Sequence, residues 1–302
     1  MLNKIIYTIL GFSLAFVFFP HNAKDFTKQP VVSGASITQT KSDLHPAPEM
    51  AVNLSAPLLT AKAAISYDLD SGTILYSKNL DQKLPIASLT KLMTALVVVD
   101  RINLNSEVTI NKSDLTGIGS TVGLVEGEQI TVSSLLNAML IPSGNDAALA
   151  LADYTAGGIE NFPTLMNQKA QQLNLSATQF SNPVGWDSWD NEDNFSSTLD
   201  LIKIVKEFLT HNELRKIVQT KETTVSSTDG RYTHQLRTTN KLLLDDPEVQ
   251  GMKTGFTSKA LGNLIILDNH QDHQVVTVIL GSNDREADSQ KLLDWTLTAY
   301  KW

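Results

Sequence analysis

The stretch Ser88–Val99, SLTKLMTALVVV, decides the fold because nearly all of its residues beyond the first turn are apolar. The run of Leu, Met, Ala and Val predicts a helix. A helix that is hydrophobic all round must be buried, so the rest of the chain has to supply layers that cover it. With 302 residues, 42% of them hydrophobic, the chain is long enough to build such a core.

Two strands are predicted before this helix and three near the end of the chain. The first two are joined at Asp70-Ser71-Gly72 and form a hairpin. A short turn at 269–272 joins the last two, which therefore pair antiparallel. The predicted strands are Ala63–Leu69, Thr73–Tyr76, Val249–Lys253, Leu261–Asp268 and Gln274–Leu280.

Helices fill the sequence between the early and the late strands. No strand–helix alternation points to a parallel sheet, so we expect the α+β type of α/β fold. An antiparallel sheet is flanked by helices, and an all-helical lobe is inserted between its early and late strands. The predicted helices are Val132–Ile141, Asp146–Tyr154, Ile159–Leu173, Thr198–Leu209 and Asp288–Tyr300, with short strands and turns over Leu115–Ile130.

Ser88 and Lys91 form the first of three short motifs that carry chemistry. Residues three apart share one face of a helix, so the hydroxyl and the amine lie together. A serine needs a neighbouring base to become a nucleophile. A lysine pKa near ~10.4 must fall by about 3 units before the amine can serve at neutral pH. The alternative interpretation is a helix N-cap beside a solvated lysine.

Ser143-Gly144-Asn145 is the second motif and follows Pro142, which ends the preceding helix. It offers a hydroxyl and an amide on a loop between two helices. Helix capping explains the same residues, because Ser and Asn are favoured N-caps.

Lys253-Thr254-Gly255 is the third motif and stands at the predicted end of a strand. Its glycine allows another segment or a ligand to approach the backbone closely. The lysine and threonine would present a cation and a hydroxyl to an anionic group. A strand end with a turn is the alternative.

Taken together, the three motifs are far more specific than each alone. Ser-x-x-Lys, Ser-x-Asn and Lys-Thr-Gly in this order characterise penicillin-interacting serine enzymes. Over 62–302 the sequence resembles the low-molecular-mass penicillin-binding proteins, that is, serine D-alanyl-D-alanine carboxypeptidases. Further matching blocks are PIASLTKLMT at 85–94, PSGNDAA at 142–148, FSNP at 180–183, TNKLL at 239–243, GMKTGFT at 251–257 and READS at 285–289.

The resemblance implies a reaction and roles for four residues. The enzyme would remove the terminal D-alanine from peptidoglycan stem peptides through an acyl-enzyme, and penicillins would acylate it. Ser88 would be the nucleophile and Lys91 its general base. Ser143 would relay a proton to the leaving amine, and Asn145 would hold the peptide amide of the substrate.

The resemblance also implies how the substrate is bound. Lys253, Thr254 and Gly255 would bind it, and Arg285 would receive the terminal carboxylate. The backbone N–H groups of Ser88 and Phe256 would form the oxyanion hole. No cofactor and no metal are implied, and the oligomeric state is left open.

Three related functions remain as alternatives. A single-domain form is also similar to the endopeptidases that cut D-alanyl cross-links. A penicillin-binding sensor would keep the fold without turnover. A class A β-lactamase would need a deacylating glutamate, and no Glu-x-x-Leu-Asn pattern follows the second motif. The family often has His after Asn182-Pro183, where this chain has Val184 followed by Gly185-Trp186.

Composition excludes several other classes. The formal net charge of −8 argues against a nucleic-acid partner, which needs a basic footprint. There is no cysteine and no Gly-x-Ser-x-Gly elbow. A metal site at His270, Asp272 and His273 is conceivable, but a solvated turn is favoured. The same holds for calcium at an acidic stretch that lacks EF-hand spacing, formed by Asp187, Asp190, Glu192 and Asp193.

The first 23 residues predict export. Lys4 precedes an apolar run that continues without charge until Lys24, as in a signal peptide or a short N-terminal anchor. Residues 24–60, rich in Pro, Ser and Thr, read as a flexible linker to a catalytic domain at 61–302. We therefore expect an extracytoplasmic protein of the bacterial envelope that touches the membrane only through this N-terminal segment.

Overall fold

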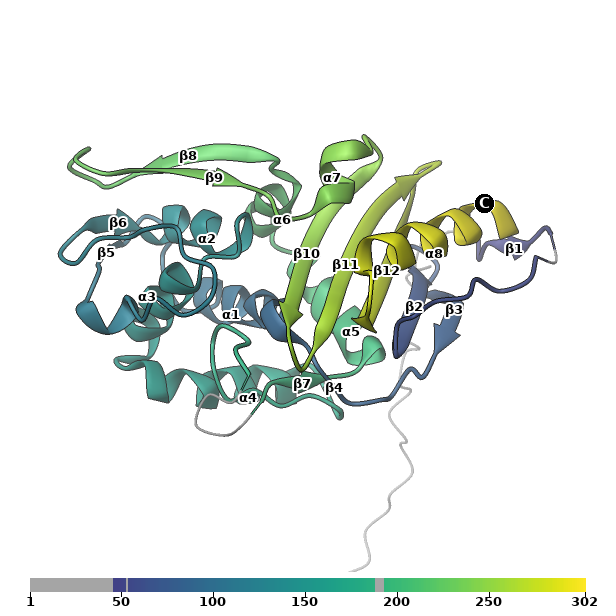
Figure 1. Ribbon diagram of the computed structural model, residues 1–302, viewed down its shortest axis with the longest axis horizontal. Coiled ribbons are helices and arrows are strands. Elements are labelled where there is room, and N and C mark those ends of the chain that lie inside the picture. The colour runs from purple at the N-terminus through teal and green to yellow at the C-terminus, as the bar shows by residue number, and fades with distance from the viewer. Residues whose placement is uncertain (1–45, 53, 188–192) are drawn as a thin grey trace, which may run out of the picture. The chain divides into compact units, whose positions relative to one another are not determined.

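A computed structural model describes residues 46–52, 54–187 and 193–302 (Figure 1). The predicted export segment and most of the predicted linker lie outside these residues. The described part belongs to one compact unit, Asp43–Trp302. In it, no helix is long and apolar enough to cross a membrane.

A five-stranded antiparallel sheet forms one half of this unit, in the order β10-β11-β12-β2-β3 (Figure 1). Helix α8, Arg285–Ala299, packs on one face and α5, Thr198–Leu209, on the other. Because both faces are covered, β2, β11 and β12 are buried almost throughout. The strands are β2 Ala63–Asp68, β3 Thr73–Lys78, β10 Val249–Thr257, β11 Leu261–His270 and β12 His273–Ser282.

The helical lobe lies between β3 and β10 in the sequence, as predicted. Its central helix is α1, Thr90–Val99, which packs against α2, α3, α4 and α5. Nine residues of α1 are buried, which its apolar sequence required. The other helices of the lobe are α2 Val132–Leu140, α3 Asn145–Ala156, α4 Phe162–Gln172 and α6 Asn212–Gln219.

Several small elements were not predicted. The hairpin β8–β9, Glu222–Ser226 and Thr233–Arg237, projects over the helical lobe and is followed by the short helix α7, Lys241–Asp245 (Figure 1). Three two-stranded pairs are formed by β1 Glu49–Met50 with β13 Tyr300–Lys301, β4 Leu84–Pro85 with β7 Phe195–Ser196, and β5 Glu107–Thr109 with β6 Gln129–Thr131. Single 3-10 turns are η1 Ala87–Leu89, η2 Lys112–Asp114 and η3 Ile159–Asn161.

Two motif placements were wrong in detail. Lys253-Thr254-Gly255 lies inside β10, because the ladder with β11 continues to Thr257. Asn145 is the first residue of α3 and not part of the preceding loop. Its side chain does not cap the helix, since it bonds to Lys91 and to the carbonyl of Ile118 instead.

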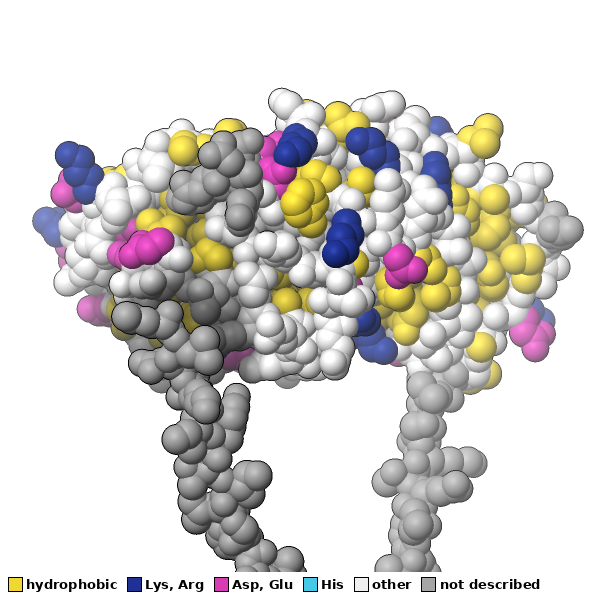
Figure 2. All heavy atoms as spheres, turned by 90° about the horizontal axis from the view of Figure 1, so that it is seen from below, with side chains coloured by type: hydrophobic (Ala, Val, Ile, Leu, Met, Phe, Trp, Pro, Cys, Tyr) yellow, Lys and Arg dark blue, Asp and Glu magenta, His cyan; other side chains and the backbone are white. Residues whose placement is uncertain are grey.

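The surface carries charges of both signs. On the face seen in Figure 2, basic and acidic side chains are scattered among neutral and apolar ones, and some of them lie next to each other.

Candidate active site

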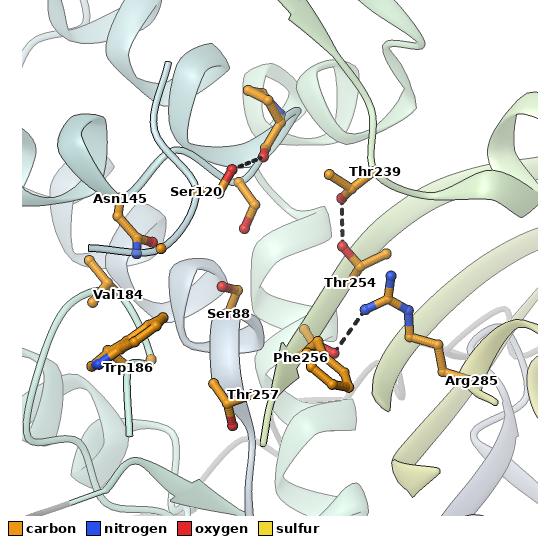
Figure 3. A pocket seen from close by; sticks show the side chains of 15 residues that line it. Ser88, Ser120, Asn145, Val184, Trp186, Thr239, Thr254, Phe256, Thr257 and Arg285 are labelled. Carbon is orange, nitrogen blue, oxygen red and sulfur yellow. Dashed lines mark hydrogen bonds between the residues drawn. The ribbon is translucent and has the colours of Figure 1, made fainter. Parts of the chain in front are cut away.

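The candidate site is a cleft of about 210 Å³ where β10 meets the start of α1 (Figure 3). Gly255 makes this approach possible. A Cβ at this position would stand 3.0 Å from the Ile86 carbonyl oxygen and 3.2 Å from the Ser88 nitrogen. The three motifs, distant in sequence, therefore meet as predicted. Residues that line the cleft include Ser88, Ser143, Asn145, Thr254, Gly255, Phe256 and Arg285.

Lys91 and Ser88 stand side by side, Ser88 in η1 and Lys91 in the first turn of α1. Lys91 Nζ lies 3.0 Å from Ser88 Oγ. The amine also donates to Asn145 Oδ1 at 2.7 Å and to the Val184 carbonyl at 3.0 Å. A neutral amine has two N–H donors and one lone pair. Two carbonyl-type oxygens can therefore take its hydrogens while the lone pair faces the serine hydroxyl.

The surroundings of Lys91 favour that neutral form. Burial lowers its pKa well below the ordinary lysine value, and the nearby charge of Lys253 lowers it further. The Asp146 carboxylate opposes these effects. Asp146 is directed elsewhere, however, because it accepts backbone N–H groups from Val122, Gly123 and Leu124 at 3.0 to 3.2 Å. Its contacts thus fix the loop across the cleft.

Ser143 and Asn145 form the opposite wall. Ser143 has a left-handed backbone, φ +68°, and its buried hydroxyl has no hydrogen-bond partner within the described part of the chain. Most buried polar groups are paired, so this hydroxyl is available to bond a substrate. Asn145 uses both ends of its side chain, since Nδ2 donates to the Ile118 carbonyl at 2.8 Å while Oδ1 accepts from Lys91.

The third motif brings a second buried lysine to the cleft. Lys253 is 1% exposed, and its Nζ donates to the Thr254 carbonyl at 3.2 Å. Burial lowers its pKa to about 7, with a further contribution from the positive charge of Arg285. The Thr254 hydroxyl lies 2.5 Å from the Thr239 hydroxyl. A loop outside the motif thus orients the threonine.

Arg285 closes the cleft from the first turn of α8. Its Nη1 donates to the Gly255 carbonyl at 3.0 Å and its Nε to Glu286 at 2.9 Å (Figure 3). Two aromatic side chains flank the opening, Phe256 at 65% and Trp186 at 40% exposure. A cleft lined by Arg285, with a hydroxyl and a base beside it and the buried Lys253 behind its wall, suits a substrate that carries an anionic end.

The loop at 182–186 is a part of the site whose role the motifs did not reveal. Asn182 Oδ1 accepts the backbone N–H groups of Val184, Gly185 and Trp186, at 2.7 to 3.2 Å, and so directs the Val184 carbonyl to Lys91. Gly185 has φ +81°, and a Cβ there would lie 1.9 Å from the Ala87 carbonyl. The Asn-Pro and Gly residues indicate a turn in the sequence. They do not indicate that this turn contacts Lys91.

The acidic stretch considered for calcium is described only in part, because Asp190 and Glu192 lie outside the described residues. Its two described ends contact Lys259. Asp187 accepts the backbone N–H of Lys259 at 3.3 Å, and Asp193 forms an ion pair with the Lys259 ammonium. One lysine therefore contacts both described ends of this stretch.

Comparison with known proteins gives a consistent result. A family model described as D-alanyl-D-alanine carboxypeptidase matches residues 50–284. D-alanyl-D-alanine carboxypeptidase DacF of Bacillus subtilis is 33% identical over 80% of this chain, and a D-alanyl-D-alanine endopeptidase of Escherichia coli is 31% identical over 82%. The crystal structure of the Streptomyces K15 DD-transpeptidase superposes with a TM-score of 0.75 at 30% identity. This superposition covers 81% of this chain and 100% of the Streptomyces chain.

The alignments differ in how much of each relative they cover. This chain spans 63% of the length of the Bacillus carboxypeptidase and 81% of the length of the Escherichia endopeptidase. The matched region contains all three motifs and all the residues that line the cleft except Arg285, which directly follows it. The chain belongs to the D-alanyl-D-alanine carboxypeptidase family of serine peptidases.

Proposed function

We propose that this chain is a serine-type D-alanyl-D-alanine carboxypeptidase that acts on peptidoglycan stem peptides and is acylated by penicillins. The observation that carries the proposal is the buried amine of Lys91, 3.0 Å from Ser88 Oγ. No carboxylate of the described residues forms an ion pair with it. A buried lysine held only by neutral oxygen atoms is suited to serve as a base.

Acylation uses Ser88 and Lys91. The Ser88 proton passes to Lys91 Nζ while Oγ attacks the carbonyl carbon of the penultimate D-alanine. The backbone N–H groups of Ser88 and Phe256 stabilise the negative oxygen that forms. Each such donor contributes about 2.7–4 kcal/mol to transition-state stabilisation.

Departure of the terminal D-alanine requires a proton on its nitrogen. Ser143 stands in the wall opposite Ser88 with a hydroxyl that has no other partner in the described residues, so it relays the proton from Lys91 to that nitrogen as the C–N bond breaks. Water then attacks the Ser88 ester, with Lys91 again taking the proton. The ester C–O bond breaks and the free serine is restored.

Recognition of the free C-terminus falls to the positive side of the cleft. The resemblance assigns the carboxylate to Arg285, while Lys253, Thr254 and Gly255 bind the rest of the terminal dipeptide. Arg285 is held in place by the Gly255 carbonyl, so its guanidinium faces the cleft instead of moving in solvent. An arginine can pair with a carboxylate through two parallel hydrogen bonds.

Endopeptidase cleavage of peptidoglycan cross-links is the second candidate. The observation that favours it is the similar identity of this chain to relatives named endopeptidase and to relatives named carboxypeptidase. A cross-link substrate continues beyond the D-alanyl residue, and the exposed side chains of Trp186 and Phe256 line the cleft and could contact that extension.

Digestion of purified muropeptides, analysed by mass spectrometry, separates these functions. A carboxypeptidase removes one alanine from monomeric pentapeptides, whereas an endopeptidase converts dimers to monomers. A labelled penicillin is used in parallel. Labelling of Ser88 without product from either substrate would identify a sensor, and absence of labelling on a folded chain would refute the proposal.

The substrate also sets the location. Peptidoglycan lies outside the cytoplasmic membrane, so the proposed function requires export to the bacterial cell envelope. We propose that residues 1–23 provide it, as a signal peptide or an anchor. Protease treatment of intact spheroplasts tests this, since a cytoplasmic chain would be protected.

A further inference from the structure

Two groups of carboxylate and imidazole side chains lie at the end of the sheet opposite the cleft. This end holds α7, the start of β10 and the β11–β12 turn (Figure 1). We call Asp68, Asp70 and His273 the first acidic group, and Glu248, Asp268 and His270 the second. In each group, one possible ligand atom per residue lies within 4.8 Å of the others.

The first acidic group is satisfied by its own turn. Asp68 accepts the backbone N–H of Ser71 at 3.1 Å and also bonds to the Ser71 hydroxyl. Asp68 Oδ1 lies 3.4 Å from His273 Nδ1, and Asp70 accepts the backbone N–H of Gln274 at 2.6 Å. These carboxylates close the hairpin between β2 and β3, so they need no further ligand.

The second acidic group contains a carboxylate that lacks such partners. Asp268 is 1% exposed, and its buried Oδ1 has no hydrogen-bond partner in the part of the chain that the structure describes. Burying an unpaired polar atom is costly, and burying an unpaired charge costs more. The neighbouring carboxylates of Asp246 and Glu248 add further negative charge beside Asp268.

The second acidic group combines two residues of β11 with one residue that precedes β10. Asp268 and His270 alternate on the same face of β11. Glu248 directly precedes Val249, which pairs with Asp268 across the ladder. Glu248 itself lies just outside the strand, and its carboxylate still comes within 4.8 Å of the ligand atoms of Asp268 and His270.

The backbone and one aromatic ring hold this arrangement. Asp246 accepts the Glu248 N–H at 2.9 Å, and the Glu248 carbonyl accepts the Asn269 N–H at 3.2 Å. The Trp302 ring packs edge-on against the His270 ring, 5.7 Å between centroids. Glu248 is exposed, so an ion can enter from solvent.

We propose that Glu248, Asp268 and His270 bind one Zn²⁺ ion through two carboxylate oxygens and one imidazole nitrogen. Two carboxylates with one imidazole suit a borderline divalent ion, whereas Mg²⁺ and Ca²⁺ prefer oxygen ligands alone. Zn–O and Zn–N bonds of about 2.0–2.2 Å require only that the exposed Glu248 and half-buried His270 side chains close on the fixed Asp268. Water completes the coordination.

The ion would link the start of β10 to the end of β11, at the end of the sheet away from the cleft. Its expected effect is on stability and not on the peptidase reaction. A ligand that binds only the folded state stabilises it in proportion to the logarithm of its concentration. The inference is independent of the proposed function, because none of its residues lines the cleft.

Titration of the metal-free full chain with ZnCl₂ tests this proposal. Calorimetry should show one Zn²⁺ per chain. At one hundred times the dissociation constant, the unfolding temperature should rise by about 5–10 °C. MgCl₂ and CaCl₂ at the same concentration should produce no such rise.

Variants locate the ion. Asp268→Asn keeps the shape of the side chain but removes its charge. His270→Gln removes the nitrogen ligand. Each variant should abolish the stoichiometric binding of Zn²⁺ and the rise in unfolding temperature. His273→Gln is the matched control, because it alters the paired histidine of the first acidic group and should retain both. Circular dichroism checks that each variant is folded.

Three outcomes would overturn the proposal. One is the absence of saturable Zn²⁺ binding to the unaltered chain. Another is full retention of binding in Asp268→Asn and in His270→Gln. The third is loss of binding in His273→Gln with retention in His270→Gln, which would move the ion to the first acidic group.

Discussion

Two buried lysines on packed helices, Lys91 in α1 and Lys169 in α4, meet opposite electrostatic surroundings. Lys169 Nζ forms ion pairs with Asp100 at 3.0 Å and Glu207 at 2.7 Å. Burial alone would lower its pKa, but the hydrogen bonds and charges of Glu207 and Asp100 outweigh burial and raise it. Lys91 instead contacts neutral oxygens and faces the cation Lys253, and its pKa falls.

The comparison shows that burial by itself does not make a lysine into a base. What distinguishes the two residues is the counter-charge that the fold places beside each one. Lys169 is a structural cation that ties α4 to the ends of α1 and α5. Burying Lys91 without a carboxylate partner costs stability. Groups with such shifted pKa values cluster at functional sites, where the neutral amine can act as a base.

Ser88→Ala should have the largest effect, because it removes the hydroxyl that Lys91 is proposed to activate. Without the hydroxyl, the neutral amine has no nucleophile to activate, so covalent penicillin labelling should disappear completely while the fold remains. Gel fluorescence of a labelled penicillin measures this, with Ser120→Ala, a second serine of the cleft, as the control. A folded Ser88→Ala chain that still becomes labelled would assign the nucleophile elsewhere.

Lys91→Met and Lys169→Met separate the two lysines by activity. Loss of the base should lower the acylation rate by about 10²- to 10⁴-fold, whereas Lys169→Met should leave it within a few-fold. The unaltered chain should acylate more slowly as the pH falls through the lowered Lys91 pKa, because protonation removes the lone pair. Stopped-flow acylation across pH measures both. Equal acylation rates in Lys91→Met and Lys169→Met would show that Lys91 is not the base.

Arg285→Ala tests the anionic end of the substrate. Charge-assisted hydrogen bonds contribute about 1.5–3 kcal/mol, so hydrolysis of peptides with a free D-alanyl carboxylate should fall about 10- to 100-fold. Penicillin acylation should fall much less. Steady-state release of D-alanine and penicillin labelling are compared in the same preparation, with the exposed Arg231→Ala as control. Equal losses in both assays would make Arg285 a structural residue.

Lys253→Met and Lys169→Met should change stability in opposite directions. Folding lowers the Lys253 pKa to about 7 from an ordinary value near 10.5, so the folded state pays to bury its charge. This cost is complete below pH 7 and disappears as the pH approaches 10.5. Lys253→Met should therefore stabilise by about 1–4 kcal/mol below pH 7, and by less toward pH 10.

The opposite sign is expected at Lys169. Its replacement leaves Asp100 and Glu207 without a partner, and because both are partly exposed the loss should be about 1–2 kcal/mol. Urea unfolding of both variants at pH 6 and pH 9 gives the comparison, with the exposed Lys241→Met as control. Destabilisation by Lys253→Met would show that its charge is compensated in the fold.

The sequence predicted α5 and the existence of the five main strands, but not every boundary, since β10 continues to Thr257. It missed the short amphipathic helix α6 and the elements that depend on distant partners. The hairpin β8–β9 alternates in burial but has few apolar side chains, so the sequence did not predict it. It is held by contacts such as that of buried His234 with Glu128 at 2.8 Å. Such a pair is 106 residues apart in the chain, beyond any local signal.

The sequence by itself determined which groups meet in the cleft. Three short motifs, each ambiguous alone, occur in one order and at suitable element boundaries, and a glycine in the third permits contact with the first. Helical spacing then places the Ser88 hydroxyl beside the Lys91 amine, because residues three apart share a face.

Only the tertiary structure decided the charge state of the lysine in the cleft motif, and how it differs from that of other buried lysines. Whether a lysine is paired with carboxylates, as Lys169 is, or set beside another cation, as Lys91 is, depends on side chains brought from distant segments. The same is true of Asp268, whose buried Oδ1 lacks a partner in the described part of the fold. Electrostatic free energy depends on distance in space and on exclusion of water, and neither quantity can be obtained from spacing along the chain.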